Sequence, residues 1–200
     1  PKDLMNLIPN SLSGSGTIYV DTYNGSTKIG TKYCGFTATV PNTTETKPKC
    51  SMALEDTTGI DDIYGSPVQG LSRIKVTVNT TLAYSSPIKS YSIQIDGDTY
   101  TTASATTGAL RKSGTSRVSV TVTDARGKTG STSYDMNVQA YSKPRVTKLN
   151  VNRCNADGTD NDQGLYIRVT FSAAVTSLGS KNTANYVLQY KKSTDNSWQT

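Results

Sequence analysis

The sequence predicts an all-β protein built from tandem immunoglobulin-like β-sandwiches, and three observations support this fold class. Apolar and polar residues alternate with the two-residue period of half-buried strands, most clearly at Val118, Val120 and Val122. Tyr is abundant, with 12 residues, and no window carries the 3.6-residue apolar period of a helix. The strand pattern also recurs after 96 to 100 residues, the length of one immunoglobulin-like sandwich.

The first segment, residues 1–44, has the pattern of the C-terminal part of a sandwich. One helical turn is expected over residues 3–8, and a strand with Ile18 and Val20 on one face follows. Asn24-Gly25 then supplies a hairpin turn, because Gly accepts a positive φ. The returning strand places four residues on the same face: Cys34, Phe36, Ala38 and Val40.

Residues 45–143 are predicted to form one complete sandwich. Alternation marks its opening strands: Cys50 to Leu54, Arg73 to Asn79, Tyr91 to Ile95 and Thr99 to Thr102. An irregular loop at residues 56–70 follows the first of them, and the turn Asp96-Gly97-Asp98 joins the last two. The closing hairpin is the clearest element of the chain, since its valine strand leads into the turn residues Asp124 to Gly127. A second alternating run returns from there: Tyr134, Met136, Val138 and Ala140.

Residues 144–200 begin the pattern again and are predicted to be the N-terminal part of a further module. The expected strands contain Val146, Leu149 and Val151, then Leu165 to Phe171, then Tyr186 to Tyr190, with Trp198 beginning another. Residues 186–190 correspond to residues 91–95 of the middle module. Pro48 and Pro144 each follow a closing hairpin directly, so the modules should lie end to end as an extended rod.

The two outer segments carry complementary parts of one repeat. The sequence therefore predicts uncovered strand edges and apolar faces at both ends. Two outcomes are open: the ends pack on the middle domain, or the N-terminal hairpin of one molecule completes the C-terminal half-sandwich of another, which would make a homo-oligomer.

The net charge of the chain bears on which kinds of partner it could bind. The chain has 21 basic and 15 acidic side chains, a net charge of +6. These charges either form a solvated surface or contact an anionic polymer such as a bacterial cell-wall glycopolymer. No recognition motif for nucleic acid occurs, and no apolar run has the length of a membrane span.

The reactive side chains predict no enzyme. Histidine is absent, which removes the usual general base, and Asp61-Asp62 and Asp96/Asp98 have the pattern of solvated turns rather than catalytic pairs. No cofactor fingerprint is present. The three cysteines, Cys34, Cys50 and Cys154, form no disulfide framework and are expected to be small buried apolar residues.

One loop, residues 155–164, is rich in oxygen ligands. Asp157, Asp160 and Asp162 are either ligands of a Ca²⁺ ion or parts of a structural turn, and the spacing of a calcium loop with its closing Glu is missing. Four tyrosines are candidates for stacking on a sugar or, alternatively, for cross-strand packing: Tyr19, Tyr23, Tyr64 and Tyr84.

Several stretches resemble minor structural proteins of long-tailed bacteriophages and prophages of Gram-positive bacteria. They are Ile8 to Ser11, residues 15–25, Val122 to Gly127, Tyr141 to Pro144, Arg153 to Thr159 and Gly164 to Phe171. The resemblance implies a tail or tail-tip protein of immunoglobulin-like and fibronectin-III-like modules, without catalytic residues. It also implies a virion protein assembled in the host cytoplasm beside other tail proteins.

Two functions of different classes follow as hypotheses. The first is a structural spacer of a phage or prophage tail that also contacts the host surface. The second is a carbohydrate-binding or adhesive module of a bacterial surface or secreted protein. The fold alone does not distinguish them, because sandwiches carry unrelated functions.

Overall fold

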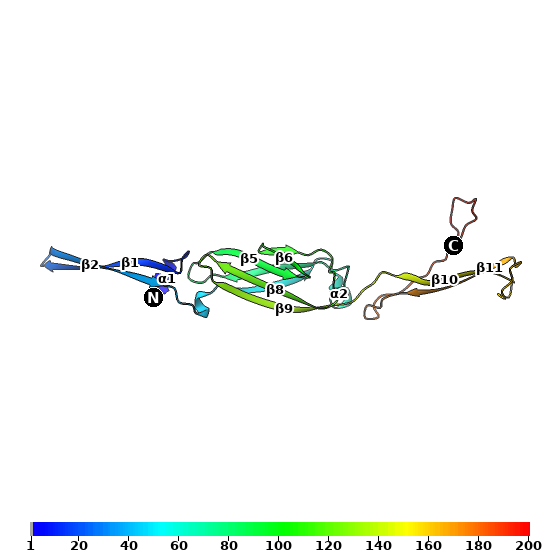
Figure 1. Cartoon of the computed structure of the whole chain (residues 1–200), viewed down its shortest axis with the longest axis horizontal. Helices are drawn as coiled ribbons and strands as arrows, with labels where there is room; N and C mark the ends of the chain where they lie inside the picture. The colour runs from blue at the N-terminus through cyan, green and yellow to red at the C-terminus, as the bar shows by residue number, and fades with distance from the viewer. Residues whose placement is uncertain (1) are drawn as a thin grey trace.

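A computed structural model describes residues 2–200 as three parts arranged end to end along one axis (Figure 1). A two-stranded hairpin precedes a central two-sheet domain, and a second two-stranded hairpin follows it. The N-terminal part comprises α1 (Lys2–Asn6), β1 (Ser13–Asn24) and β2 (Thr27–Thr39), and a short 3₁₀ turn, η1 (Thr44–Thr46), leads to the central domain. The C-terminal part comprises β10 (Arg145–Cys154) and β11 (Tyr166–Ala174).

The central domain is a sandwich of seven strands. One sheet has the order β3-β4-β7 and the other the order β6-β5-β8-β9. The strands are β3 (Lys49–Asp56), β4 (Ile74–Thr81), β5 (Ile88–Ile95), β6 (Asp98–Tyr100), β7 (Ser104–Thr106), β8 (Gly114–Asp124) and β9 (Thr129–Val138), with the short helix α2 (Ile60–Tyr64) between β3 and β4. Three and four antiparallel strands facing each other make an immunoglobulin-like sandwich. The predicted fold class is therefore confirmed.

The core of the sandwich lies between the two sheets. Side chains of β4, β5, β8 and β9 fill it, joined by Leu110 from the loop before β8. Val118, Val120 and Val122 of β8 are fully buried while their polar neighbours face outward. The alternation seen in the sequence is thus the pleat of a strand with one face on a core.

The turns of the sandwich follow from their residues. Gly127 has a φ of +81°, and the amide of Lys128 donates to Oδ1 of Asp124 at 2.7 Å, which closes the β8–β9 turn. Asp96 and Gly97 both have positive φ, +52° and +88°, as a two-residue hairpin loop of the Asp-Gly type requires.

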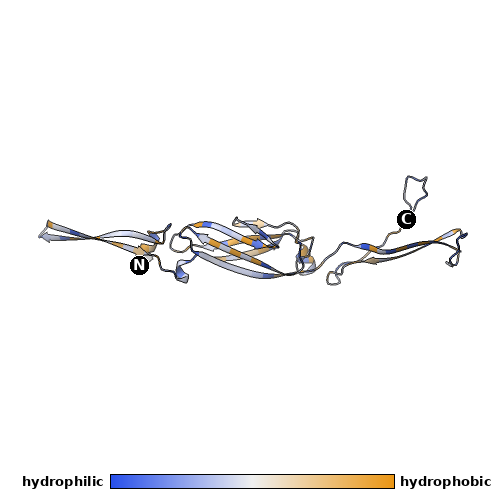
Figure 2. Cartoon of the chain, in the orientation of Figure 1, coloured by the Kyte–Doolittle hydropathy of each residue, from blue (hydrophilic) through white to orange (hydrophobic). Residues whose placement is uncertain are grey.

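The two terminal hairpins are single layers with both faces exposed. Figure 2 shows hydrophobic residues along these strands, which no second sheet covers. Ile18 and Val20 are 59% and 62% exposed, whereas their repeat counterparts Val118 and Val120 are at 0%. Sequence pattern alone therefore did not decide burial, since burial needs the facing layer as well.

Two local predictions were wrong. Cys34 is exposed rather than buried, because its side of the β1–β2 hairpin has no covering sheet, while Cys154 is buried and Cys50 half-buried. Residues 186–190 form no strand, and Tyr190 makes a single bridge with Gln199. A strand requires a hydrogen-bonding neighbour, and no sheet of the described chain includes this segment.

Candidate interaction surfaces

The junction between the N-terminal part and the sandwich is built on Arg126, in the β8–β9 turn. Its guanidinium is 5% exposed and donates four hydrogen bonds of 2.8 Å to main-chain carbonyls. Two acceptors, Met5 and Ile8, belong to the N-terminal segment, and two, Ala83 and Tyr84, to the β4–β5 loop. The fork of the guanidinium thus joins segments that are far apart in the sequence.

Lys128, two residues further on, is the second cation that joins the N-terminal part to the sandwich. Its ammonium Nζ donates to the carbonyl of Pro41 at 2.6 Å and to Oγ1 of Thr46 at 3.1 Å. Burial lowers the pKa of Lys128 from its usual value of 10.5, and the Asp124 carboxylate opposes that shift only in part. Arg126 and Lys128 together fasten the N-terminal hairpin to the end of the sandwich. Sequence reasoning placed Arg126 in a turn but gave no sign that either cation is buried.

The junction on the C-terminal side has a different character. The Ser142 and Thr176 hydroxyls lie 2.8 Å apart, and the Lys181 ammonium donates to the carbonyl of Ile63 at 2.9 Å. These contacts are exposed to solvent. Exposed hydrogen bonds compete with water, so we expect this junction to bend more easily than the N-terminal one.

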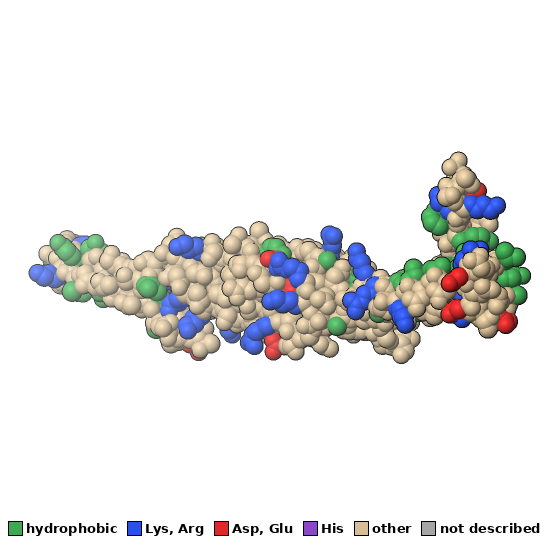
Figure 3. All heavy atoms as spheres, turned by 45° about the vertical axis from the view of Figure 1, so that its right-hand side comes forward, with side chains coloured by type: hydrophobic (Ala, Val, Ile, Leu, Met, Phe, Trp, Pro, Cys, Tyr) green, Lys and Arg blue, Asp and Glu red, His purple; other side chains and the backbone are tan. Residues whose placement is uncertain are grey.

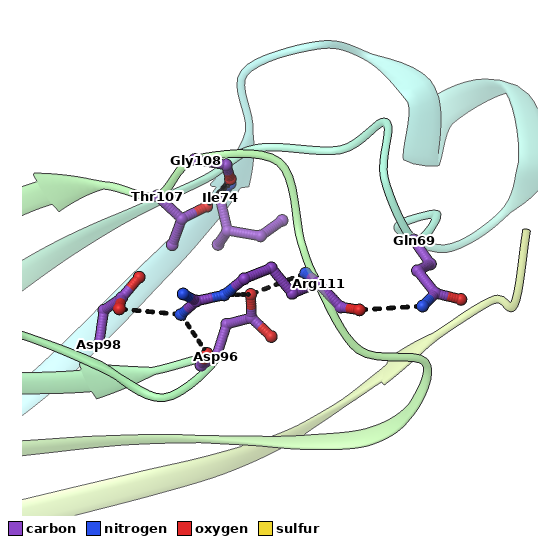
Figure 4. Close-up of polar contacts among 7 residues, drawn as sticks. All are labelled: Gln69, Ile74, Asp96, Asp98, Thr107, Gly108 and Arg111. Atoms are coloured by element: carbon purple, nitrogen blue, oxygen red, sulfur yellow. Dashed lines mark hydrogen bonds and ion pairs between the residues drawn. The ribbon is translucent and has the colours of Figure 1, made fainter.

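A third polar cluster surrounds Arg111 at the β5–β6 turn (Figure 4). Arg111 bonds Asp96 through its backbone amide and Nε, at 2.7 and 3.2 Å, and contacts Asp98 through a terminal guanidinium nitrogen at 2.8 Å. The hydrogen bonds that Arg111 donates to Asp98 first, and then to Asp96, raise the pKa of Arg111. The Gln69 amide adds a bond of 2.9 Å to the Arg111 carbonyl. The carboxylates predicted in a turn are thus committed to an ion pair that holds the β5–β6 turn.

The other acidic candidates are also engaged locally. Asp61 and Asp62 lie in α2, where Oδ1 of Asp61 accepts the amide of Asp62 at 3.0 Å and its carbonyl accepts the amide of Gly65.

The acidic loop between β10 and β11 shows the contacts of a structural turn. Oδ1 of Asp157 accepts the amide and the hydroxyl of Thr159, at 2.9 and 2.6 Å, and this lowers the pKa of Asp157. Asp160 pairs with Arg168 of β11, and Asp162 is exposed. Across residues 2–200 no group of three acidic, cysteine or histidine side chains is placed to hold a metal ion.

The candidate sugar-stacking tyrosines do not converge on one site. Tyr19 packs against Tyr33 across the β1–β2 hairpin, with ring centroids 6.0 Å apart, which is the expected cross-strand pair. Tyr23 lies near the tip of that hairpin, Tyr64 ends α2, and Tyr84 uses its carbonyl for Arg126. No described helix is long and apolar enough to cross a membrane.

Two apolar faces lie uncovered by a second sheet, one on each terminal hairpin. The N-terminal face consists of Ile18, Val20, Cys34 and Phe36, which lie on one side of β1–β2 because Ile18 pairs with Cys34 and Gly16 with Phe36. The C-terminal face consists of Leu149, Val151, Ile167, Val169 and Phe171 on β10–β11. Figure 3 shows hydrophobic side chains at the surface toward both ends of the molecule. Apolar surface of this kind usually marks an interaction site.

Comparison with known proteins places the chain among phage proteins. Residues 1–197 match the model of a family described as siphovirus protein of unknown function (DUF859). The curated proteins contain no match. The fibronectin(III)-like modules of CbhA from Clostridium thermocellum are a partial structural match, with 13% identity, a TM-score of 0.37, and coverage of 62% of this chain and 77% of that one. Because the family model spans nearly the whole sequence, the chain belongs to this family of siphovirus proteins.

Proposed function

We propose that this chain is a structural component of the siphovirus tail, a spacer of the tail tip or fibre whose partners are other tail proteins. The observation that carries the proposal is the membership of a siphovirus family, combined with parts that lie end to end rather than around a cleft. The buried Arg126 and Lys128 bonds suit a spacer, because they resist bending at one junction. We assign residues 1–44, 45–143 and 144–200 to three successive modules, and no catalytic role to any of them.

The experiment is immunogold labelling of purified virions of a siphovirus that encodes this chain. Antibodies raised against the 200-residue protein are expected to label the tail, at its tip or on a fibre. A matched sample treated with pre-immune serum is the control. Label confined to the bacterial surface, with none on virions, would contradict the proposal and favour an adhesive or carbohydrate-binding module of a bacterial protein.

Contact with the host surface is the second part of the proposal. The net charge of +6 favours an anionic cell-wall glycopolymer of a Gram-positive host, by an attraction that salt screens. Cosedimentation with purified walls should show binding that falls as salt rises and is lost when the anionic polymer is extracted from the walls. Equal binding to extracted walls would contradict the proposed contact with an anionic glycopolymer. It would not affect the proposed structural role.

A further inference from the structure

The central sandwich shows how two hairpins of the repeat fit together. β3–β4 lies on one sheet and β8–β9 on the other, and their inner faces share one core. β3 and β9 run in the same direction. Gly130, at the start of β9, lies against the carbonyl of Pro48 just before β3, and Gln139, just after β9, bonds the carbonyl of Tyr64 in the loop after β3.

The N-terminal face reproduces the inner face of β8–β9 pair by pair. Ile18 pairs with Cys34 as Val118 pairs with Tyr134, and Thr22 pairs with Gly30 as Val122 pairs with Gly130. Phe36 stands where Met136, buried in the core, stands in the sandwich. The same side of the hairpin that is covered in the central module is therefore largely apolar and uncovered in the N-terminal one, with Lys32 opposite Val20 where the sandwich has Thr132 opposite Val120.

The C-terminal face reproduces the inner face of β3–β4 in the same way. Leu149 pairs with Phe171 as Met52 pairs with Val78, and Val151 pairs with Val169 as Leu54 pairs with Val76. A register shift between Val146 and Lys148 keeps the two patterns in phase, so that Val146 takes the place of Cys50. Both hairpins thus keep the faces that fit each other within the sandwich.

We propose that the N-terminal face of one molecule docks on the C-terminal face of a second copy of the chain, as β8–β9 docks on β3–β4. The proposal does not depend on the tail location. In the sandwich the two hairpins have parallel chain directions, so the second copy lies along the same axis rather than beside the first (Figure 1). The contact joins unlike surfaces and does not close, which makes it head-to-tail.

Gly30 supports this fit independently of hydrophobicity. At Gly130 an added Cβ would lie 2.0 Å from the carbonyl oxygen of Pro48, so the close approach of that chain requires glycine. At Gly30 an added Cβ meets nothing within 4 Å, and its φ is not in the left-handed region. Gly30 also lies beside the register shift between Thr22 and Tyr23, and glycine is common at such irregularities of a hairpin. The carbonyl of Pro144 from a second copy, the counterpart of Pro48, fills the space that Gly30 leaves.

Residues 183–189 complete the arrangement. Together with β10–β11 they line a groove of about 530 Å³, and Tyr186 contacts Phe171 with ring centroids 5.6 Å apart. Their counterpart β5 pairs with β8, with Ile93 opposite Val120. The same register sets Leu188 of one molecule opposite Val20 of the other. The free edge of β1 would thereby gain a strand, a common mode of association between sheets.

The size of the contact predicts weak association. A face ten residues long and two strands wide covers roughly 33 Å by 10 Å. Two such faces bury roughly 700 Å² in total, which is below the area of standard specific interfaces and in the range of weak, transient contacts. We therefore expect oligomers that form with rising concentration and dissociate on dilution.

The test is sedimentation velocity of the 200-residue protein from about 5 to about 500 µM. Gly30→Ala places a methyl group where Pro144 should approach, and Gly35→Ala places one on the opposite face of the same strand, near only the carbonyl of Gly16 at 3.9 Å. Wild type and Gly35→Ala should gain mass with concentration, and Gly30→Ala should associate at least about tenfold more weakly. A wild type that stays monomeric, equal association of Gly30→Ala, or loss in both variants would each overturn the proposal.

A cross-linking experiment tests the register. In a Cys34→Ser background, the variant Val20→Cys is mixed with a separate variant, Leu188→Cys, and oxidised. A disulfide between the two chains, identified by peptide mass spectrometry, is expected. The control mixes Leu188→Cys with Thr17→Cys, which lies on the other face of β1. A yield no higher than that of the control would contradict the register.

Discussion

Arg126 connects the N-terminal segment to the sandwich through four carbonyls and no carboxylate. Removing the side chain would deprive all four carbonyls of their donor at once. A buried acceptor that is left unpaired lowers the stability of the folded state. In Arg126→Ala we expect the amides of Leu7 and Ile8 to exchange with deuterium faster, with the opening free energy lowered by about 1.5 to 3 kcal/mol. Hydrogen exchange followed by mass spectrometry measures this directly.

The matched control is Arg117→Ala on β8, whose exposed guanidinium bonds Ser133 on the neighbouring strand. That variant should leave exchange in residues 2–9 unchanged. If Arg126→Ala also left it unchanged, the guanidinium would not be what fastens the junction.

Asp56, at the end of β3, makes the stability of the sandwich depend on pH in the acidic range. Burial by itself raises the pKa of Asp56, but hydrogen bonds from Ser72, Thr58 and the amide of Arg73 outweigh it and lower the pKa below 3.8. The folded state therefore stabilises the ionised form of Asp56 more than the unfolded state does. Its stabilising contribution is complete above about pH 3.8 and is lost as the pH falls through the lower folded value.

Asp56→Asn should be less stable than wild type near neutral pH, and the difference should shrink in acid. Urea unfolding between about pH 7 and about pH 2 measures the gap, with Asp62→Asn in the exposed helix α2 as the control. A gap that stayed constant over this range would show that the ionised form of Asp56 is not what stabilises the fold.

At the scale of elements, two residues at the same position of the repeat show that a shared sequence pattern does not guarantee the same burial. Ile93 of β5 is at 0% exposure, and its counterpart Leu188 is 55% exposed. Ile93→Ala should lower the free energy of unfolding by about 2 to 5 kcal/mol, because it leaves a cavity in the core. Leu188→Ala should change the stability of dilute protein by no more than about 0.5 kcal/mol. Equal costs in thermal or urea unfolding would contradict this account of the core.

The β10–β11 loop is the element for which a cation was considered. Asp157 is occupied by Thr159 and Asp160 by Arg168, so we expect the melting temperature to be the same in Ca²⁺ and in a chelator. A rise of several degrees with Ca²⁺ would show that the loop rearranges around the ion.

Strand identity was predictable from the sequence wherever alternation met turn residues. The β8–β9 hairpin and the Asp96-Gly97 turn are examples, since the period of two and the glycine conformation are local properties. The three-residue strand β7 and the helix α2 were not predicted, because neither is long enough to show a period. The exposure of Cys34 and the burial of Arg126 depend on which segments lie opposite, and local sequence does not contain that information.

At the scale of the whole molecule, the arrangement is a row of β-structures fastened firmly at one junction and more loosely at the other. Because its three parts lie in a row, this siphovirus protein is long for its number of residues. We propose a spacer role for this reason. The head-to-tail docking of copies would extend the same row without a change of direction. Both statements require that the single molecule be long and narrow in solution.

Small-angle X-ray scattering on the monomer peak eluting from a gel-filtration column tests this requirement most directly. A compact fold of 200 residues has a radius of gyration of about 16 Å. We predict a value well above that, with a distance distribution that peaks near the sandwich width and tails to several times that length. A radius close to 16 Å with a symmetric distribution would mean that the hairpins fold back on the sandwich, and it would contradict the spacer account.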